Sequence, residues 1–128
     1  IAIDVTLAID VPGTPGPEEV SRFGDGVAIS IMNGASITNR KLLNRFVKLA
    51  KDNKINYQMD VMPKGGTDAG AIQKAPGGCA VTTISIPCRY IHSTVETVHK
   101  QDIQDVIDLL AAYLEEPGDM DYTLVNVD

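Results

Sequence analysis

The sequence predicts an α/β fold in which helices flank a mostly parallel or mixed sheet. Segments with the two-residue apolar period of strands alternate along the chain with segments of helical apolar spacing, which favours this layered fold. The chain has 128 residues, 44% of them hydrophobic, so it can bury the core of one domain without a disulfide or a structural metal.

The first strand is predicted over Ile1–Val11, where large apolar residues alternate with small or acidic ones. Asp4 and Asp10 share the face that carries the small residues. Residues 12–17 contain three prolines and two glycines, so they cannot form a helix or a ladder. An irregular loop is therefore predicted as far as Gly24 or Gly26.

The middle of the chain alternates strands and helices. A strand over Val27–Met32 is followed by an Asn33-Gly34 turn, and a helix runs from a Thr38 or Asn39 cap to about Asn53, because its apolar residues recur at helical spacing. The remaining segments are a strand over Tyr57–Met62, a loop at 64–68, a short helix near 69–74 and a loop at 76–78.

The last part of the domain is predicted as a central strand and a helix. Ala80–Ile86 is rich in Val, Thr and Ile and is ended by Pro87. Over 101–115, Asp102 and Asp105 at the start complement the helix dipole. The apolar stripe predicted to face the core consists of Ile103, Val106, Ile107, Leu110, Tyr113 and Leu114. The domain is expected to cover residues 1–116, and the acidic tail at 117–128 is given no structure.

The charge and composition exclude some classes of binding partner. The formal net charge of −6 argues against nucleic acid, which requires clustered Lys and Arg, and no apolar run is long enough for a membrane helix. Cys79 and Cys88 lack metal spacing and are expected to be core thiols in a reducing cytoplasm. The chain opens at Ile1 in a strand pattern, without a Met, so it is expected to be part of a longer protein.

Three groups of residues could carry chemistry, and each has a structural alternative. Asp4 is either exposed on an edge strand or buried with a cation or metal, whereas Asp10 is expected to accept from loop amides. The Gly65-Gly66-Thr67-Asp68 loop could approach a ligand or simply cap a helix. His92, in the Arg89–Ser93 segment after the central strand, could be a metal ligand, a general base or a surface residue, and His99 is expected to be a surface residue.

Taken together, three sequence motifs point to one protein family. Asp4–Gly13 (DVTLAIDVPG), Gly65–Ala71 (GGTDAGA) and Pro87–Ser93 (PCRYIHS) occur in the order and approximate spacing of one family. The chain resembles the C-terminal part of the catalytic domain of the tetrahedral metallo-aminopeptidases, which include glutamyl and deblocking aminopeptidases and proteins named endoglucanases. The resemblance extends from Ile1 to about Glu116.

The resemblance implies a zinc-peptidase-like α/β domain with two divalent metal ions, zinc or cobalt, that hydrolyses peptides from the N-terminus. It also implies a homo-oligomer, a tetrahedral dodecamer in the family. By matching motifs, Asp4 would bind one ion and His92 the other in a shared cavity. Gly65, Gly66, Thr67, Asp68 and Arg89 would line the cleft beside them. The other ligands and the general base are expected upstream of Ile1, so the isolated chain is expected to be inactive.

Two other functions remain as alternatives. An endoglucanase-type glycoside hydrolase would need two carboxylates roughly 5 to 10 Å apart, whereas Asp4 and Asp10 would lie about 20 Å apart along an extended strand. The chain could instead be an inactive fragment or an assembly subunit. Chelator-sensitive release of amino acids, compared with release of reducing sugar, separates the two enzymatic hypotheses.

Overall fold

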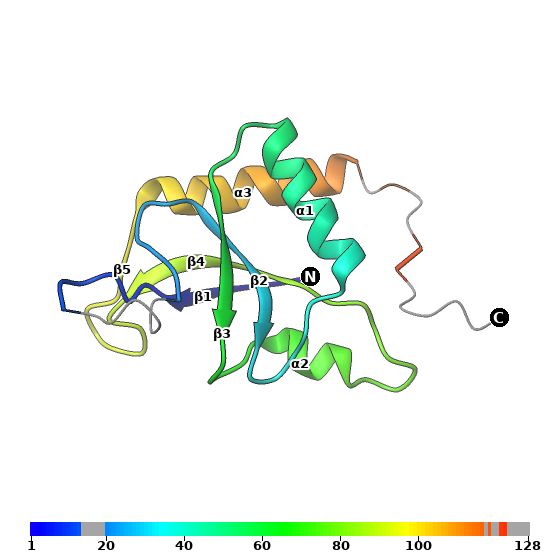
Figure 1. Cartoon of the computed structure of the whole chain (residues 1–128), viewed down its shortest axis with the longest axis horizontal. Helices are drawn as coiled ribbons and strands as arrows, with labels where there is room; N and C mark the ends of the chain where they lie inside the picture. Colours follow the sequence, from blue (N-terminus) through cyan, green and yellow to red (C-terminus); the bar gives the residue numbers. More distant parts are fainter. Residues whose placement is uncertain (14–19, 117, 119–120, 123–128) are drawn as a thin grey trace.

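The computed structural model describes residues 1–13, 20–116, 118 and 121–122 (Figure 1). Most of the predicted acidic tail and residues 14–19 of the predicted loop lie outside this part of the chain. The strands are β1 (Ala2–Leu7), β2 (Val27–Asn33), β3 (Tyr57–Met62), β4 (Thr83–Arg89) and β5 (Thr97–Val98), and the helices are α1 (Arg40–Asp52), α2 (Asp68–Gln73) and α3 (Lys100–Glu115). The predicted α/β fold is confirmed.

The sheet is mixed and has the strand order β1-β4-β2-β3. β1 runs parallel to β4 and β3 runs parallel to β2, whereas β2 and β5 pair with β4 in the antiparallel sense. β4 is therefore the central strand, as the sequence predicts. The sheet brings the end of β4 beside the end of β1, since Leu7 pairs with Cys88 in the parallel register.

The predicted bounds of the central strand are wrong. The strand begins at Thr83 rather than Ala80 and continues through Pro87 to Arg89. A proline fits here because the antiparallel partners of β4 oppose Ile84 and Ser85 in β2 and Cys88 and Arg89 in β5, which leaves Pro87 between the two ladders. Its missing N–H group therefore removes no hydrogen bond from either antiparallel ladder, and Pro87 lies opposite Thr6 in the parallel ladder with β1.

Helices α1 and α3 lie side by side over one face of the sheet, and α2 lies on the other side (Figure 1). The main core forms where α1 and α3 meet β2 and β4, and Phe46 of α1 stacks on Tyr113 of α3 with 4.8 Å between the ring centroids. The predicted cap of α1 is confirmed at Asn39, whose side chain accepts from the amides of Lys41 and Leu42. Among the described residues, no helix is both long enough and apolar enough to span a membrane.

The apolar stripe predicted for α3 is wrong at two of its positions. Ile107 is 52% exposed and Leu114 is 65% exposed, whereas Asp102 and Asp105 are buried on the face that packs against the sheet. Asp102 is inside because its carboxylate accepts hydrogen bonds from the amides of Gly24 and Gly26. The acid thus stabilises the loop that precedes β2 as well as lying in the first turn of α3.

Candidate functional site

Strand β1 presents Asp4 on the face of the sheet opposite α1 and α3. Residues on this face alternate with those of the other face, so Asp4 lies between Ala2 and Thr6, both buried. The carboxylate itself is half-buried and accepts a hydrogen bond from the amide of Val5 at 2.8 Å. Among the described residues, β1 has one neighbouring strand, β4, so Asp4 lies on an edge strand.

His92 follows the end of β4 in a turn with unusual backbone geometry. Tyr90 and His92 have φ angles of 59° and 62°, in the left-handed region that residues other than glycine rarely occupy. The amide of His92 donates to the carboxylate of Glu96, and the hydroxyl of Ser93 donates to the carbonyl of Tyr90. The imidazole is exposed, and its backbone position is set by contacts within this turn.

The glycines of the 64–67 loop are explained mainly by backbone geometry and packing. Gly65 has a φ of 87°, and a Cβ added to Gly66 would lie 2.5 Å from the Cβ of Ala35. Thr67 occupies the N-cap position of α2 but makes no capping bond with its side chain. Its hydroxyl lies 2.8 Å from that of Thr83 on β4 instead. The capping hypothesis for the side chain of Thr67 is therefore wrong.

These three segments meet around one cavity of about 250 Å³. Its lining comes from β1, from the end of β3 with the loop after it, and from the turn after β4. The lining residues are Asp4, Val5, Leu7, Met62, Lys64, Gly65, Gly66, Thr67, Ile91 and His92. Three segments that are separate in the sequence therefore bring a carboxylate, an imidazole and a glycine loop to one place. Whether these residues bind metal or substrate stays a prediction.

Arg89 and Asp68 are not part of this lining. The guanidinium of Arg89 donates to both carboxylate oxygens of Asp10, at 2.9 and 3.0 Å, and lies 4.4 Å from the ring centroid of Phe23. This pair, together with the amide of Phe23, lowers the pKa of Asp10. Asp10 therefore accepts from a loop amide, as predicted, and also anchors Arg89, which the sequence did not indicate.

Asp4 and His92 carry donor atoms of the types that bind zinc and similar metal ions. Carboxylate oxygen and imidazole nitrogen are ligands that zinc accepts, and imidazole also suits its neighbours in the first transition row. A catalytic zinc ion usually has about three protein ligands, but the described residues contain no group of three His, Cys, Asp or Glu side chains placed to hold one. The cavity thus offers part of a metal site.

The structure also contains a buried acid that the sequence pattern does not indicate. Asp60 of β3 is 2% exposed and accepts a hydrogen bond from the hydroxyl of Thr6 on β1 at 2.9 Å. Burial raises its pKa from 3.8 to about 6, against the opposing effect of Thr6. The sequence gives no signal for this, because an acid on a strand with alternating pattern normally faces solvent.

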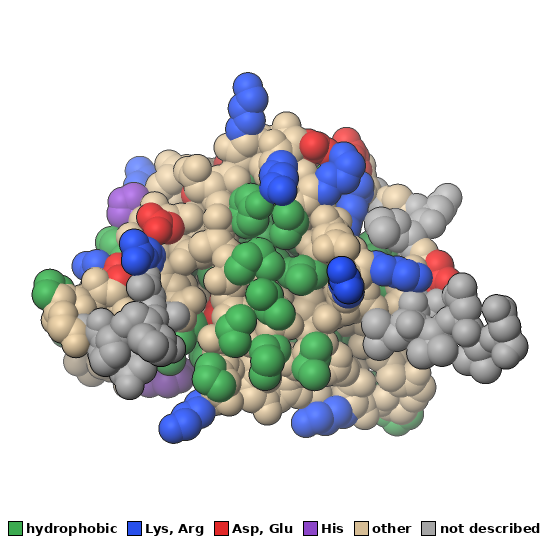
Figure 2. Space-filling model, viewed as in Figure 1, with side chains coloured by type: hydrophobic (Ala, Val, Ile, Leu, Met, Phe, Trp, Pro, Cys, Tyr) green, Lys and Arg blue, Asp and Glu red, His purple; other side chains and the backbone are tan. Residues whose placement is uncertain are grey.

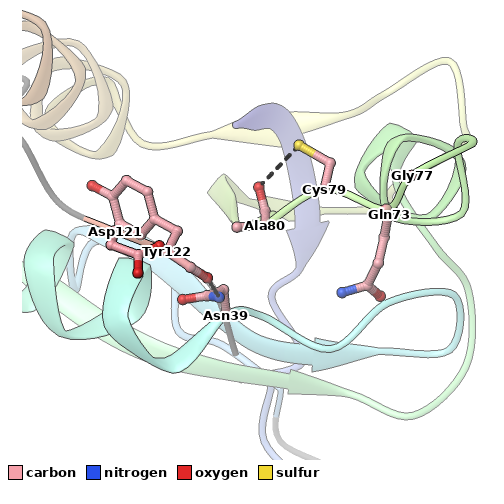
Figure 3. Close-up of a pocket in the computed structure, with 8 residues that line it drawn as sticks. Asn39, Gln73, Gly77, Cys79, Ala80, Asp121 and Tyr122 are labelled. Carbon is pink, nitrogen blue, oxygen red and sulfur yellow. Dashed lines mark hydrogen bonds between the residues drawn. The ribbon is translucent and has the colours of Figure 1, made fainter. Parts of the chain in front are cut away.

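A larger cavity, of about 580 Å³, lies near the start of α1 and the loop after α2 (Figure 3). None of the predicted site residues lines it. Asn39 at its edge caps α1 and donates to the carbonyl of Tyr122. The Cys79 thiol lies 3.5 Å from the carbonyl of Ala80. Cys79 is exposed, so the expectation of a core thiol is wrong for this residue, whereas it is confirmed for the buried Cys88. The polar groups of Asn39 and Cys79 thus interact with backbone amides and carbonyls, so the smaller cavity remains the candidate site.

Comparisons with known proteins give one family. The model of the M42 glutamyl aminopeptidases matches residues 1–109. The lysyl aminopeptidase of Pyrococcus furiosus is 38% identical over 124 residues, which cover 96% of this chain and 34% of that protein. The curated relatives that the chain matches are about three times as long as the matched part, since coverage is 33% and 34% of two of them.

Solved structures agree with this match. The aminopeptidase APDkam598 from the archaeon Desulfurococcus kamchatkensis is 44% identical and superposes with a TM-score of 0.87, over 90% of this chain and 33% of that one. The TET1 peptidase of Pyrococcus horikoshii, which can assemble into a tetrahedron or a large octahedral shell, is 30% identical with a TM-score of 0.69, over 87% of this chain and 32% of that one.

Proposed function

Because the chain belongs to the M42 glutamyl aminopeptidase family, we propose that it supplies part of the active site of a metal-dependent aminopeptidase. The observation that carries this proposal is the cavity shared by Asp4, His92 and the loop at Gly65–Thr67. The enzyme would remove N-terminal residues from peptides by hydrolysis assisted by two divalent metal ions, zinc or cobalt.

Each residue of the cavity has a role in this proposal. Asp4 would hold one ion through its carboxylate and His92 the other through its imidazole. When bound, such ions lower the pKa of a shared water and polarise the scissile carbonyl. The backbone of Gly65–Thr67 would position the peptide beside them. Arg89 would act indirectly, since its guanidinium holds Asp10 and the end of β4 rather than facing the cavity.

The remaining donors and the general base would come from outside these 128 residues. The chain offers one plausible donor for each ion and spans about a third of its relatives. A general base alone contributes about 10²- to 10⁴-fold to the rate. The isolated chain should therefore bind zinc or cobalt weakly and release no amino acid.

The glycoside hydrolase alternative has no support in the site. Asp4 is the one carboxylate among the residues that line the cavity, and Asp10 is committed to Arg89. Hydrolysis of a sugar by the usual route requires two carboxylates that flank the same bond.

The test compares the 128-residue chain with the whole protein that contains it. Release of free amino acid from an aminoacyl amide is measured with added Co²⁺ or Zn²⁺, with and without chelator. We expect chelator-sensitive turnover by the whole protein and none by the chain alone. Asp4→Asn and His92→Ala in the whole protein should each reduce activity by more than the roughly 10- to 100-fold typical of an outer-shell partner. Asp108→Asn, an exposed acid of α3 outside the cavity lining, is the matched control.

Two outcomes would contradict the proposal. Robust turnover by the purified 128-residue chain would show that the ligands are misplaced, and a whole protein insensitive to chelator would exclude the metallopeptidase assignment. Chelator-insensitive release of reducing sugar would favour the glycosidase, and a whole protein without either activity would favour an inactive or assembly role.

The assembly and the cellular location belong to the same proposal. We expect a homo-oligomer of tetrahedral type, on the basis of the structural neighbour that forms such shells. We also expect a cytoplasmic protein, because both cysteines are free thiols and Cys88 is buried in the fold.

A further inference from the structure

The turn between β4 and β5 holds His92 in the left-handed backbone region, which residues other than glycine rarely adopt. Tyr90 and His92 have left-handed φ angles of 59° and 62°, and neither is a glycine, the type that adopts this region without steric cost. Such geometry persists only when the surrounding contacts impose it. The contacts that impose it at His92 can be identified individually.

Glu96 makes the contact that bears directly on His92. Its carboxylate accepts a hydrogen bond from the amide of His92, with 2.5 Å between nitrogen and oxygen. An ionised acceptor makes this bond stronger than one between neutral groups. Ser93 stabilises the same turn from the other side, since its hydroxyl donates to the carbonyl of Tyr90 and accepts from the amide of Val95.

The position of Glu96 is fixed by the sheet rather than by the turn itself. The residue after it, Thr97, begins β5 and pairs with Arg89 in the antiparallel register, and Val98 pairs with Cys88. Arg89 is in turn held by Asp10 through two hydrogen bonds. Glu96 therefore directly precedes a strand that is paired with β4, and this pairing fixes the position of its backbone.

We propose that Glu96 is a positioning residue that turns His92 toward the cavity. His92 and Ile91 line that cavity together with Asp4, and a change of φ at His92 to the ordinary extended region would redirect the imidazole. The inference rests on the proposed function, because it matters only if His92 is a ligand. Glu96 lies outside the cavity lining, so it acts through the backbone of His92.

Two variants and one control test the conformational part on the 128-residue chain without any metal. Glu96→Ala removes the acceptor, Glu96→Gln retains an amide oxygen, and Thr97→Val removes a side-chain hydrogen bond to the carbonyl of Val95 in the same turn without touching His92. NMR reports the sign of φ at His92 through the Overhauser effect between its amide and Hα protons, which is strong at positive φ. We expect its loss in Glu96→Ala and its retention in Glu96→Gln and Thr97→Val.

The functional part uses Zn²⁺ alone as the probe. The shift of the His92 ring resonances on titration with Zn²⁺ gives an apparent affinity, which we expect to be about 10-fold weaker in Glu96→Ala, as for other outer-shell partners. Glu96→Gln should recover most of it, and Thr97→Val should match the wild type. Because Glu96 is exposed, the variants should keep the amide spectrum of the folded core.

The outcomes separate this inference from the proposed function. If His92 keeps a positive φ in Glu96→Ala, or if φ changes while the Zn²⁺ affinity does not, the positioning role of Glu96 is wrong. If φ depends on Glu96 but His92→Ala leaves the activity of the whole protein unchanged, the ligand role in the proposed function fails, and the positioning role of Glu96 fails with it.

Discussion

Asp60 shows how a single residue links two strands that are not neighbours. β1 and β3 lie at opposite ends of the strand order, yet the Thr6 hydroxyl of β1 donates to one carboxylate oxygen of Asp60. The other carboxylate oxygen is buried without a hydrogen-bond partner among the described residues. Burial without full compensation disfavours the charged form, which is why the pKa of Asp60 is raised to about 6.

This residue makes stability depend on pH in a defined direction. The pKa of Asp60 is about 6 in the folded chain and 3.8 without the fold, so the folded state binds the proton more tightly. The contribution of the protonated Asp60 to the free energy of unfolding is fully present below about pH 4, and it is lost as the pH rises through 6. The loss amounts to about 3 kcal/mol.

Asp60→Asn should remove most of this dependence. The amide oxygen can still accept from Thr6, but the side chain no longer ionises. Urea unfolding from pH 4 to 8 should show the free energy of unfolding of the wild type falling by up to about 3 kcal/mol more than that of the variant. Parallel pH profiles for the two chains would show that Asp60 is not the titrating group.

At the level of elements, the sequence predicted segments whose local signals agree with their packing. β3 has the predicted bounds, and α1 begins after the Asn39 cap, because alternation or capping and burial point the same way there. Its side chains Leu42 and Phe46 are buried as predicted. Tertiary contacts decided other features, such as the place of Pro87 in β4, where the antiparallel ladders with β2 and β5 leave its position free.

The candidate site also has features that the sequence predicted and features that it did not. The motifs placed Asp4, His92 and Gly65–Thr67 in one region, since strand ends and the loops after them converge in α/β sheets. The partners of Arg89 and of Asp102 could not be predicted, because each side chain is bound by a loop distant in sequence. Acids on the buried face of α3 also contradict simple apolar patterning.

The turn after β2 packs closely against the loop after β3 because glycines lie at the contact. A Cβ on Gly66 would meet the Cβ of Ala35 at 2.5 Å, and a Cβ on Gly34 would meet the backbone oxygen of Gly65 at 2.6 Å. Gly66→Ala should therefore lower the free energy of unfolding by about 1 to 3 kcal/mol, the usual cost of overpacking.

A double-mutant cycle tests the stated cause. Ala35→Gly removes the atom that Gly66→Ala would strike, so the double variant should recover part of the loss. Gly34→Ala is the control, because its clash is with backbone and Ala35→Gly should not relieve it. Equal rescue of both glycine variants would contradict the packing explanation.

On the scale of the molecule, the sheet has an apolar face that α1 and α3 do not fully cover. Figure 2 shows hydrophobic side chains gathered in the middle of the face on which β3 lies, with Lys and Arg side chains around them. The exposed apolar residues of β2 and β3 include Ile31, Met59 and Val61. In the described part of the chain, β3 pairs with β2 alone, so an open strand edge adjoins this surface.

An open edge beside an apolar surface favours association between chains. We expect the isolated chain to self-associate at high concentration, and Val61→Lys to weaken this association because it puts a charge on the edge strand at a side chain that is 45% exposed. Leu114→Lys on α3, an apolar residue 65% exposed but on a helix, is the matched control and should leave it unchanged. Sedimentation equilibrium measures the association constant of each chain. A monomeric wild type, or a larger effect of Leu114→Lys than of Val61→Lys, would show that the β3 edge is not the surface through which copies of the chain meet.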